Sequence, residues 1–147
     1  MATEQEPDLE PLLGVQQNRL GQVLSDGDSI DSKALAILGA NIAILIFIDQ
    51  AGLHNPLWQL VAVCAPLLLS LLLDFVAIWP QKYLTAVTLS EAPSYLAMDR
   101  PTLVLQLLAD TAAAISHNEQ VNRRRLRACL SSIVLTALGF LLLLVIL

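Results

Sequence analysis

Three stretches of the chain are almost entirely apolar, and each is long enough to cross a lipid bilayer. They cover residues 34–48, which reach 20 residues when extended to residue 53, and residues 57–79 and 128–147. At 1.5 Å per residue, a helix of roughly 20 residues spans about 30 Å, the thickness of the hydrocarbon core. The pattern predicts an all-α integral membrane bundle with about three transmembrane helices. The first two would form a transmembrane hairpin over residues 34–79.

The edges of the second stretch carry residue types that delimit a membrane span. Trp58 and Trp79 lie at its two ends, where aromatic side chains anchor helices at the interface, and Pro80 then stops it. Residues 49–56 (DQAGLHNP) form a short polar turn before it. Pro66 disfavours a straight helix, although neighbouring helices can satisfy the freed carbonyl. A soluble domain is the alternative, but 147 residues cannot surround three such helices.

Residues 1–33 form an acidic segment that is predicted to contain an amphipathic helix. Apolar residues recur at helical spacing over residues 9–24, and the Ser-Asp-Gly sequence at 25–27 predicts the end of this helix. Asp28 or Ser29 would then cap a new helix that continues into the first span.

Residues 80–127 are predicted to form a cytoplasmic helical insert. Asp99 and Pro101 mark a helix start, with the proline in the first turn and the aspartate as its cap. Apolar positions then keep to one face, and the pattern can continue as one helix into the third span at 128–147. The apolar face needs a partner, either the helix at 9–24 or another subunit.

All eight basic residues fall on one side of the predicted membrane. Arg19 and Lys33 precede the first span, the turn at 49–56 has no base, and the other six lie between the second and third spans. The positive-inside rule therefore predicts a multi-pass protein with a cytoplasmic N-terminus.

Composition argues against an ordinary soluble enzyme. Apolar residues make up 56% of the chain and charged residues 14%, whereas a soluble domain has about 25% charged residues. The net charge of −5 arises within residues 1–33 and gives no argument for a nucleic-acid partner. Residues 1–10 lack the apolar core of a signal peptide.

The chain offers few groups for catalysis or metal binding. Two cysteines and two histidines indicate neither a disulfide framework nor a metal site. We find no Ser-His-Asp set, Gly-rich phosphate loop or paired carboxylates, and we expect neither catalysis nor a cofactor.

Polar residues inside the spans are the most informative. Asp74 lies five residues inside Trp79, and Asn41 has a comparable depth in the first span. Ser131 and Ser132 are their counterparts in the third span. An acid at the centre of a span costs about 2.5–3.5 kcal/mol on insertion scales and usually faces a partner or a wet cavity. We favour a structural polar contact or a protonated Asp74. The alternative is that Asp74 and Asn41 line a pore or gate that opens on oligomerisation.

Small residues on the first span would let a neighbouring helix approach closely. This small-residue face consists of Ala36, Gly39, Ala40 and Ala43. Cys129, beside the membrane, is better explained as a small packing residue than as a palmitoylation site.

A run of arginines at residues 123–127 precedes the third span. The simpler interpretation is contact with anionic lipid, each base contributing about 1 kcal/mol. The alternative is an anion site for a nucleotide phosphate, with His117 and Asn118 one to two turns upstream.

The order of these features resembles the small transmembrane effectors of bacterial Pycsar antiphage defence, and the wider set of two-transmembrane effector modules beside nucleotide second-messenger synthases. The resemblance covers residues 15–147. It rests on an Asp-Ser-Lys-Ala start at 31–34, a short turn, a second span that ends at Pro80, and a helical insert that closes with the basic run.

The resemblance implies a membrane effector in the bacterial inner membrane. A cyclic mononucleotide (cCMP or cUMP) made during phage infection would bind the cytoplasmic part and drive homo-oligomer assembly. The spans would then impair the lipid bilayer and cause abortive infection. No stretch resembles a cyclic-nucleotide-binding β-roll, so the ligand would use a helical pocket between subunits. The cations available to it are Lys33, Arg123, Arg124 and Arg125.

A second interpretation belongs to a different functional class. The chain would be a small non-enzymatic structural or regulatory subunit of a membrane complex, held by the small-residue face. A phage holin is a third and less favoured interpretation, given the long basic insert.

Overall fold

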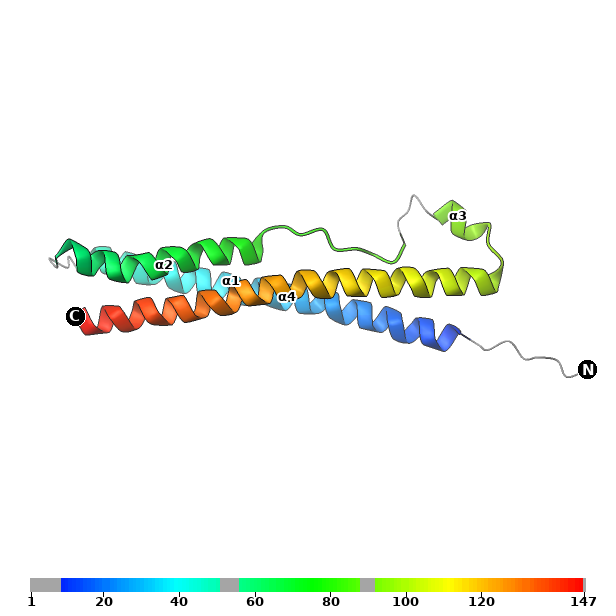
Figure 1. The fold of residues 1–147 in the computed structure, drawn as a ribbon, viewed down its shortest axis with the longest axis horizontal. Helices are drawn as coiled ribbons and strands as arrows, with labels where there is room; N and C mark the ends of the chain where they lie inside the picture. The colour runs from blue at the N-terminus through cyan, green and yellow to red at the C-terminus, as the bar shows by residue number, and fades with distance from the viewer. Residues whose placement is uncertain (1–8, 51–55, 88–91, 147) are drawn as a thin grey trace, which may run out of the picture. The chain divides into compact units, whose positions relative to one another are not determined.

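The computed structural model describes residues 9–50, 56–87 and 92–146. These ranges contain four helices, α1 (Glu10–Gln50), α2 (Leu57–Ile78), α3 (Ala92–Leu96) and α4 (Arg100–Ile146) (Figure 1). They contain no strand. The predicted all-α bundle is therefore confirmed. α1, α2 and α4 are each long and apolar enough to span a membrane, so the chain is a multi-pass membrane protein.

α1 is continuous through the point where the Ser-Asp-Gly sequence predicts a helix end. That prediction is wrong, because residues 25–27 are helical and Gly27 is buried. The Ser32 hydroxyl also donates a hydrogen bond of 3.0 Å to the Asp28 carbonyl one turn back, in place of the expected cap. A glycine inside a helix costs only about 1 kcal/mol, and packing outweighs that cost here.

Buried positions recur every seven residues along the two long helices, as in a coiled coil. On α1 they are residues 20, 27, 34, 41 and 48, and on α4 they are residues 104, 111, 118, 125, 132 and 139. The buried positions on α2 are spaced alternately by four and three residues, which also gives a repeat of seven. They are Val63, Leu67, Ser70, Asp74 and Ala77. This repeat explains why a weak turn sequence does not interrupt α1.

α4 begins where the sequence predicts. The Asp99 carboxylate accepts a hydrogen bond of 3.4 Å from the Thr102 amide, and bonds from Thr102 lower the pKa of this carboxyl. From there α4 continues through the arginine run into the third span without a break. The prediction of one long helix is confirmed.

The chain divides into two compact units, and each long helix contributes to both. Unit 1 comprises residues 1–26 and 82–121, and unit 2 comprises residues 27–81 and 122–147. The unit boundaries fall within seven residues of the divisions at residues 33, 79 and 127 that follow from hydropathy.

In unit 1, α1 packs against α4. Leu20 and Val23 of α1 meet Ala114 and Ile115 of α4, and Ala86 packs against this cluster. The partner of the apolar face on the insert is therefore the N-terminal helix of the same chain. Two exposed ion pairs, Arg19–Glu119 at 2.9 Å and Arg100–Glu10, link the same helices.

A non-helical segment, residues 82–87, lies along α4 in unit 1, where the Asn118 side chain binds it. Asn118 is fully buried. Its Oδ1 accepts a 2.9 Å bond from the Leu84 amide, and its Nδ2 donates a 2.9 Å bond to the Leu84 carbonyl. One side chain thus satisfies both backbone groups of a residue that has no helix or sheet to do so.

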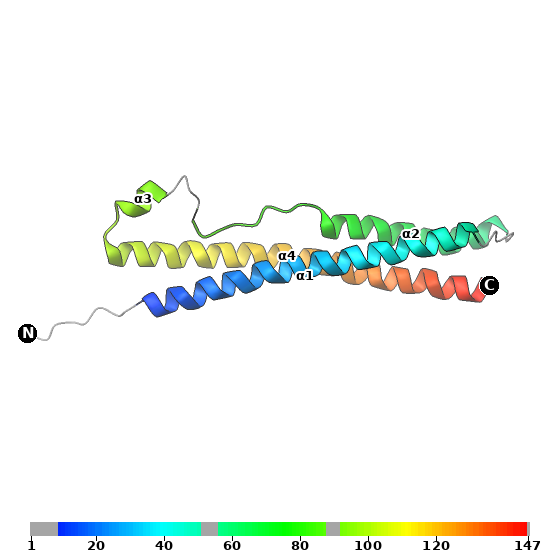
Figure 2. The same ribbon diagram turned by 180° about the vertical axis from the view of Figure 1, so that it is seen from behind.

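In unit 2, α2 runs back along α1 and α4 (Figure 2). Two apolar clusters lie at opposite ends of the bundle. One is formed by Ala34, Ala77, Ala128 and Cys129, and the other by Ile48, Val63, Leu67 and Leu143. Gly139 permits a close approach near the second cluster, because an added Cβ would lie 2.7 Å from the Leu67 side chain.

Candidate functional site

Five polar side chains from three helices meet between the two apolar clusters of unit 2. They are Asn41 of α1, Ser70 and Asp74 of α2, and Ser132 and Thr136 of α4, hereafter the polar cluster. Asn41, Ser70, Asp74 and Ser132 have no exposed surface. The heptad repeat places them there, since each occupies an inward position of its helix.

The Asp74 carboxylate is held by groups from both neighbouring helices. Its Oδ2 accepts a 3.1 Å bond from Asn41 Nδ2, and its Oδ1 lies 2.5 Å from the Ser132 hydroxyl. Among the residues that the structure describes, no basic side chain forms an ion pair with Asp74. The acid therefore sits among neutral polar groups without a counter-charge.

The Ser70 hydroxyl is the centre of the polar cluster. It lies 2.7 Å from Ser132 Oγ and 2.8 Å from Thr136 Oγ1, and it accepts a 2.8 Å bond from Asn41 Nδ2. Thr136 Oγ1 donates a 2.9 Å bond to Asn41 Oδ1, which closes the cluster on the side of α1. All three spans are thus cross-linked by hydrogen bonds at one level.

The structure brings Asp74 and Asn41 into direct contact, facing inward. This arrangement is the structural polar contact that the sequence favours, and a pore lined by these residues stays a prediction. Of the two serines, Ser132 joins the polar cluster and Ser131 is exposed. Ser70 and Thr136 were not predicted as members of such a contact, although each lies four residues from a member on the same helix and hence on the same face.

Arg125, a candidate ligand for a nucleotide phosphate, binds groups of two other helices. Its side chain is 5% exposed and pairs with Asp31 of α1, while its Nε donates a 2.6 Å bond to the Ala77 carbonyl in the last turn of α2. Burial lowers the pKa of the guanidinium, and the charge of Asp28 opposes this. Asp31 and Ala77 use donors of Arg125 between the helices, and a role of this side chain at an anion site stays a prediction.

The other candidate cations lie on the surface of unit 2. Lys33 on α1 and Arg123 and Arg124 on α4 are exposed. The proposed upstream companions are occupied elsewhere, because Asn118 binds Leu84 and His117 Nε2 lies 3.3 Å from the Lys82 carbonyl. The predicted grouping of these two with the arginines is thus not seen.

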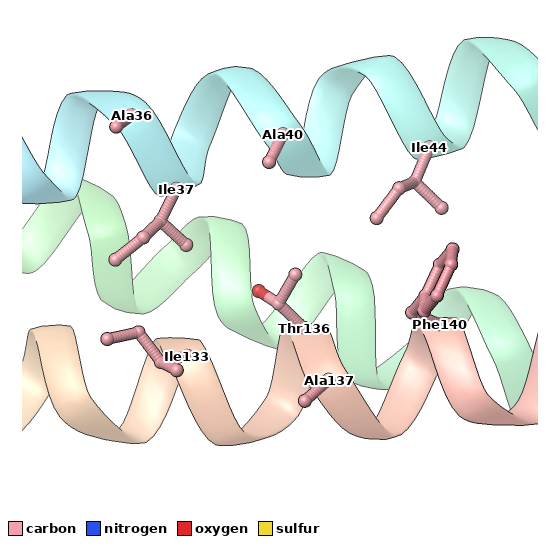
Figure 3. Close-up of a pocket in the computed structure, with 8 residues that line it drawn as sticks. All are labelled: Ala36, Ile37, Ala40, Ile44, Ile133, Thr136, Ala137 and Phe140. Atoms are coloured by element: carbon pink, nitrogen blue, oxygen red, sulfur yellow. The ribbon is translucent and has the colours of Figure 1, made fainter.

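Within the part of the chain that the structure describes, the small-residue face is exposed and does not pack closely against another helix. Ala36, Gly39, Ala40 and Ala43 are exposed, and nothing lies within 4 Å of a Cβ added at Gly39. The reason is helical phase, since the neighbouring heptad positions face inward instead. Figure 3 shows Ala36 and Ala40 beside an apolar hollow between α1 and α4, with Phe140 across from α1.

Three further predictions concern the ends of α2, Cys129 and the turn at 49–56. Trp58 and Trp79 are 68% and 65% exposed at the two ends of α2, as interfacial anchors require. Cys129 is buried beside Ala34 and Ala77, consistent with a packing role. Most of the turn at 49–56 lies outside the described residues.

Comparison with known proteins does not extend this picture. No protein-family model, curated protein or solved structure matches the chain. Within the described ranges, no group of three or more His, Cys, Asp or Glu side chains could hold a metal ion.

Proposed function

We propose that the chain is a membrane effector of bacterial antiphage defence. A cyclic mononucleotide, cCMP or cUMP, would bind its cytoplasmic part, drive homo-oligomerisation and lead the spans to impair the inner membrane. The N-terminus would be cytoplasmic, as the placement of the basic residues indicates.

The inside-out polarity of unit 2 is the observation that carries the membrane part of this proposal. Its interior holds the polar cluster, while large apolar side chains point outward. On α2 alone, Leu68, Leu72, Phe75 and Val76 are each at least half exposed. An apolar exterior of this kind is stable in lipid and aggregates in water.

The continuity of α1 and α4 supports the effector part. Each helix contributes residues to both units without a break in its hydrogen bonding. A ligand that changes one end of such a helix can therefore bias its other end, provided that it binds two arrangements with different affinity.

The exposed cations at the start of the spans support an anionic ligand. Lys33, Arg123 and Arg124 present positive charge on the surface of unit 2. Charge-assisted bonds from arginine are the usual means of holding a phosphate. Anionic lipid headgroups are the competing ligand of the same chemistry.

The alternative function is a non-enzymatic structural subunit. The internal bonding of Asn41 and Asp74 favours it, because neither side chain faces outward as a pore lining would. In this case the exposed small-residue face would bind one stoichiometric partner.

Membrane potential in bacterial cells that express the full chain tests the proposal. We expect depolarisation only when a cyclase for cCMP or cUMP is co-expressed, and loss of this response in the double variant Arg123→Gln/Arg124→Gln. Lys82→Gln removes an exposed basic charge from unit 1 and serves as the matched control. An unchanged potential with both nucleotides would contradict the proposal, and purification with one stoichiometric partner would favour the structural subunit.

A further inference from the structure

The polar cluster contains a closed circuit of five short contacts. Asp74 Oδ1 lies 2.5 Å from Ser132 Oγ, which lies 2.7 Å from Ser70 Oγ. Ser70 Oγ lies 2.8 Å from Thr136 Oγ1, which lies 2.9 Å from Asn41 Oδ1. The Asn41 amide nitrogen returns to Asp74 Oδ2 at 3.1 Å.

If each of these five contacts is a hydrogen bond, the circuit needs five hydrogens, one in each. The Ser70 and Thr136 hydroxyls also lie 3.0 Å and 2.9 Å from the Ser132 carbonyl oxygen, and these two contacts hold no hydrogen when the circuit is fully bonded. The three hydroxyl groups supply three, and the Asn41 amide supplies one to the circuit, since its second hydrogen points to Ser70 Oγ at 2.8 Å. An ionised Asp74 supplies none, so two oxygen atoms of the circuit would face each other without a hydrogen. Reversing the Asn41 amide leaves this count unchanged, because it still contributes one hydrogen to the circuit.

We infer that the polar cluster is a proton-binding site and that Asp74 holds the proton. The protonated Oδ1 of Asp74 donates a hydrogen bond to Ser132 Oγ. The Ser132 hydroxyl in turn donates to Ser70 Oγ. The Ser70 hydrogen goes to Thr136 Oγ1, and the Thr136 hydrogen goes to Asn41 Oδ1. Every hydroxyl then donates one bond and accepts one within the circuit, an arrangement in which neighbouring bonds polarise and strengthen one another.

Among the described residues, no basic side chain forms an ion pair with Asp74. The charge of Asp74 acts on the Cys129 thiol of α4, and so does the charge of Lys33 of α1. Arg125 is paired with Asp31. A carboxylate without a counter-ion is strongly disfavoured among apolar helices, and a bound proton removes its charge.

Loss of the proton would have a structural consequence. It would leave a negative charge and an unbonded oxygen pair where the three helices meet. The bundle should therefore be most stable when the site is protonated and should weaken as the pH rises through the ionisation of Asp74. This inference is independent of the proposed defence function, since it depends only on the contacts within unit 2.

Infrared difference spectroscopy on the full chain in phosphatidylcholine vesicles tests the site. At a pH of about 7, exposed carboxyl groups are ionised. The infrared spectrum of the wild type minus that of Asp74→Asn should therefore show the carbonyl band of a protonated carboxylic acid. This band should shift in D2O. Asp26→Asn, at an exposed acid of unit 1, is the control, and its difference spectrum should lack that band.

Three outcomes would overturn the inference. One is a difference spectrum for Asp74→Asn that contains only ionised carboxylate bands. Another is a protonated band that disappears when sodium replaces potassium, which would assign a metal cation to the site. If Asp74→Asn does not fold, titration of the wild type decides, and loss of every protonated band at a pH of about 6 would contradict the proton site.

Discussion

Arg125 of α4 and Asp31 of α1 lie 94 positions apart in the chain and form an ion pair in unit 2. The arginine side chain is 5% exposed and the aspartate side chain 39% exposed. The same guanidinium caps the carbonyl end of α2 through Ala77. One side chain thereby joins three helices at one end of the membrane-spanning part.

Replacing Arg125 with glutamine should destabilise the bundle by about 1.5–3 kcal/mol, the range for hydrogen bonds to charged groups. The effect should stay below that of a fully buried pair because water screens Asp31. The free energy of unfolding, measured by SDS titration of the full chain in detergent micelles, checks this. Arg124→Gln, at an exposed neighbouring position, should change it by about 0.5 kcal/mol or less. Equal losses in both variants would contradict the role of Arg125.

Gly139→Ala should also destabilise unit 2, by about 1–3 kcal/mol, because the added methyl group would collide with Leu67. Gly39→Ala is the matched control, since nothing lies near its Cβ. We expect it to be neutral or stabilising by about 1 kcal/mol through helix propensity. Thermal unfolding followed by circular dichroism distinguishes the two, and a lower Tm for the Gly39 variant would argue against the described packing.

Asn118→Ala should release the segment that Asn118 binds in unit 1. Both hydrogen bonds to Leu84 are lost, so the Leu84 amide should exchange with solvent roughly 10-fold faster or more. Amide hydrogen exchange of the full chain in micelles measures this. Gln120→Ala, at an exposed position on the same helix, should leave the exchange rate unchanged. Unaltered exchange in Asn118→Ala would mean that other contacts hold the segment.

Self-association through the small-residue face can be tested with Gly39→Leu. A large side chain there keeps two helices apart, so energy transfer between labelled chains in vesicles should fall. The fold of the single chain should persist, because the position faces away from the other helices. Leu68→Ala, on the exposed face of α2, serves as the control. Undiminished energy transfer in Gly39→Leu would show that this face does not mediate association.

The membrane-spanning architecture could be predicted from the sequence because each span is a long apolar run with marked ends. The continuity of α1 could not, because Ser25 and Gly27 are usual at helix ends. Only the seven-residue repeat that includes Gly27 and Ala34 indicates otherwise. That repeat is hard to see, since its inward positions hold glycine, alanine and asparagine as well as leucine and isoleucine.

The polar cluster could be predicted only in part. Asp74 and Asn41 are conspicuous in apolar surroundings, whereas Ser70 and Thr136 are ordinary residues in a span. The four-residue spacings from Ser70 to Asp74 and from Ser132 to Thr136 are the signal that could have found them.

The roles of the arginines required three-dimensional information. In the sequence they form one basic run, but each step along a helix turns by about 100°. Arg125 therefore faces inward toward Asp31, while Arg123 and Arg124 face outward.

The shared phase of the buried positions also limits how the length of α1 can change. Within unit 2, Asp31 must face Arg125 and Asn41 must face Asp74. One residue inserted between Asp31 and Asn41 would turn the helix beyond it by about 100° around its axis. The two contacts could then no longer form at the same time. Seven inserted residues would restore the facing direction but would move Asn41 about 10 Å along the axis, past its partners on α2. We therefore expect that a chain with an insertion or deletion between residues 31 and 41 forms this bundle only if α2 and α4 change length with it.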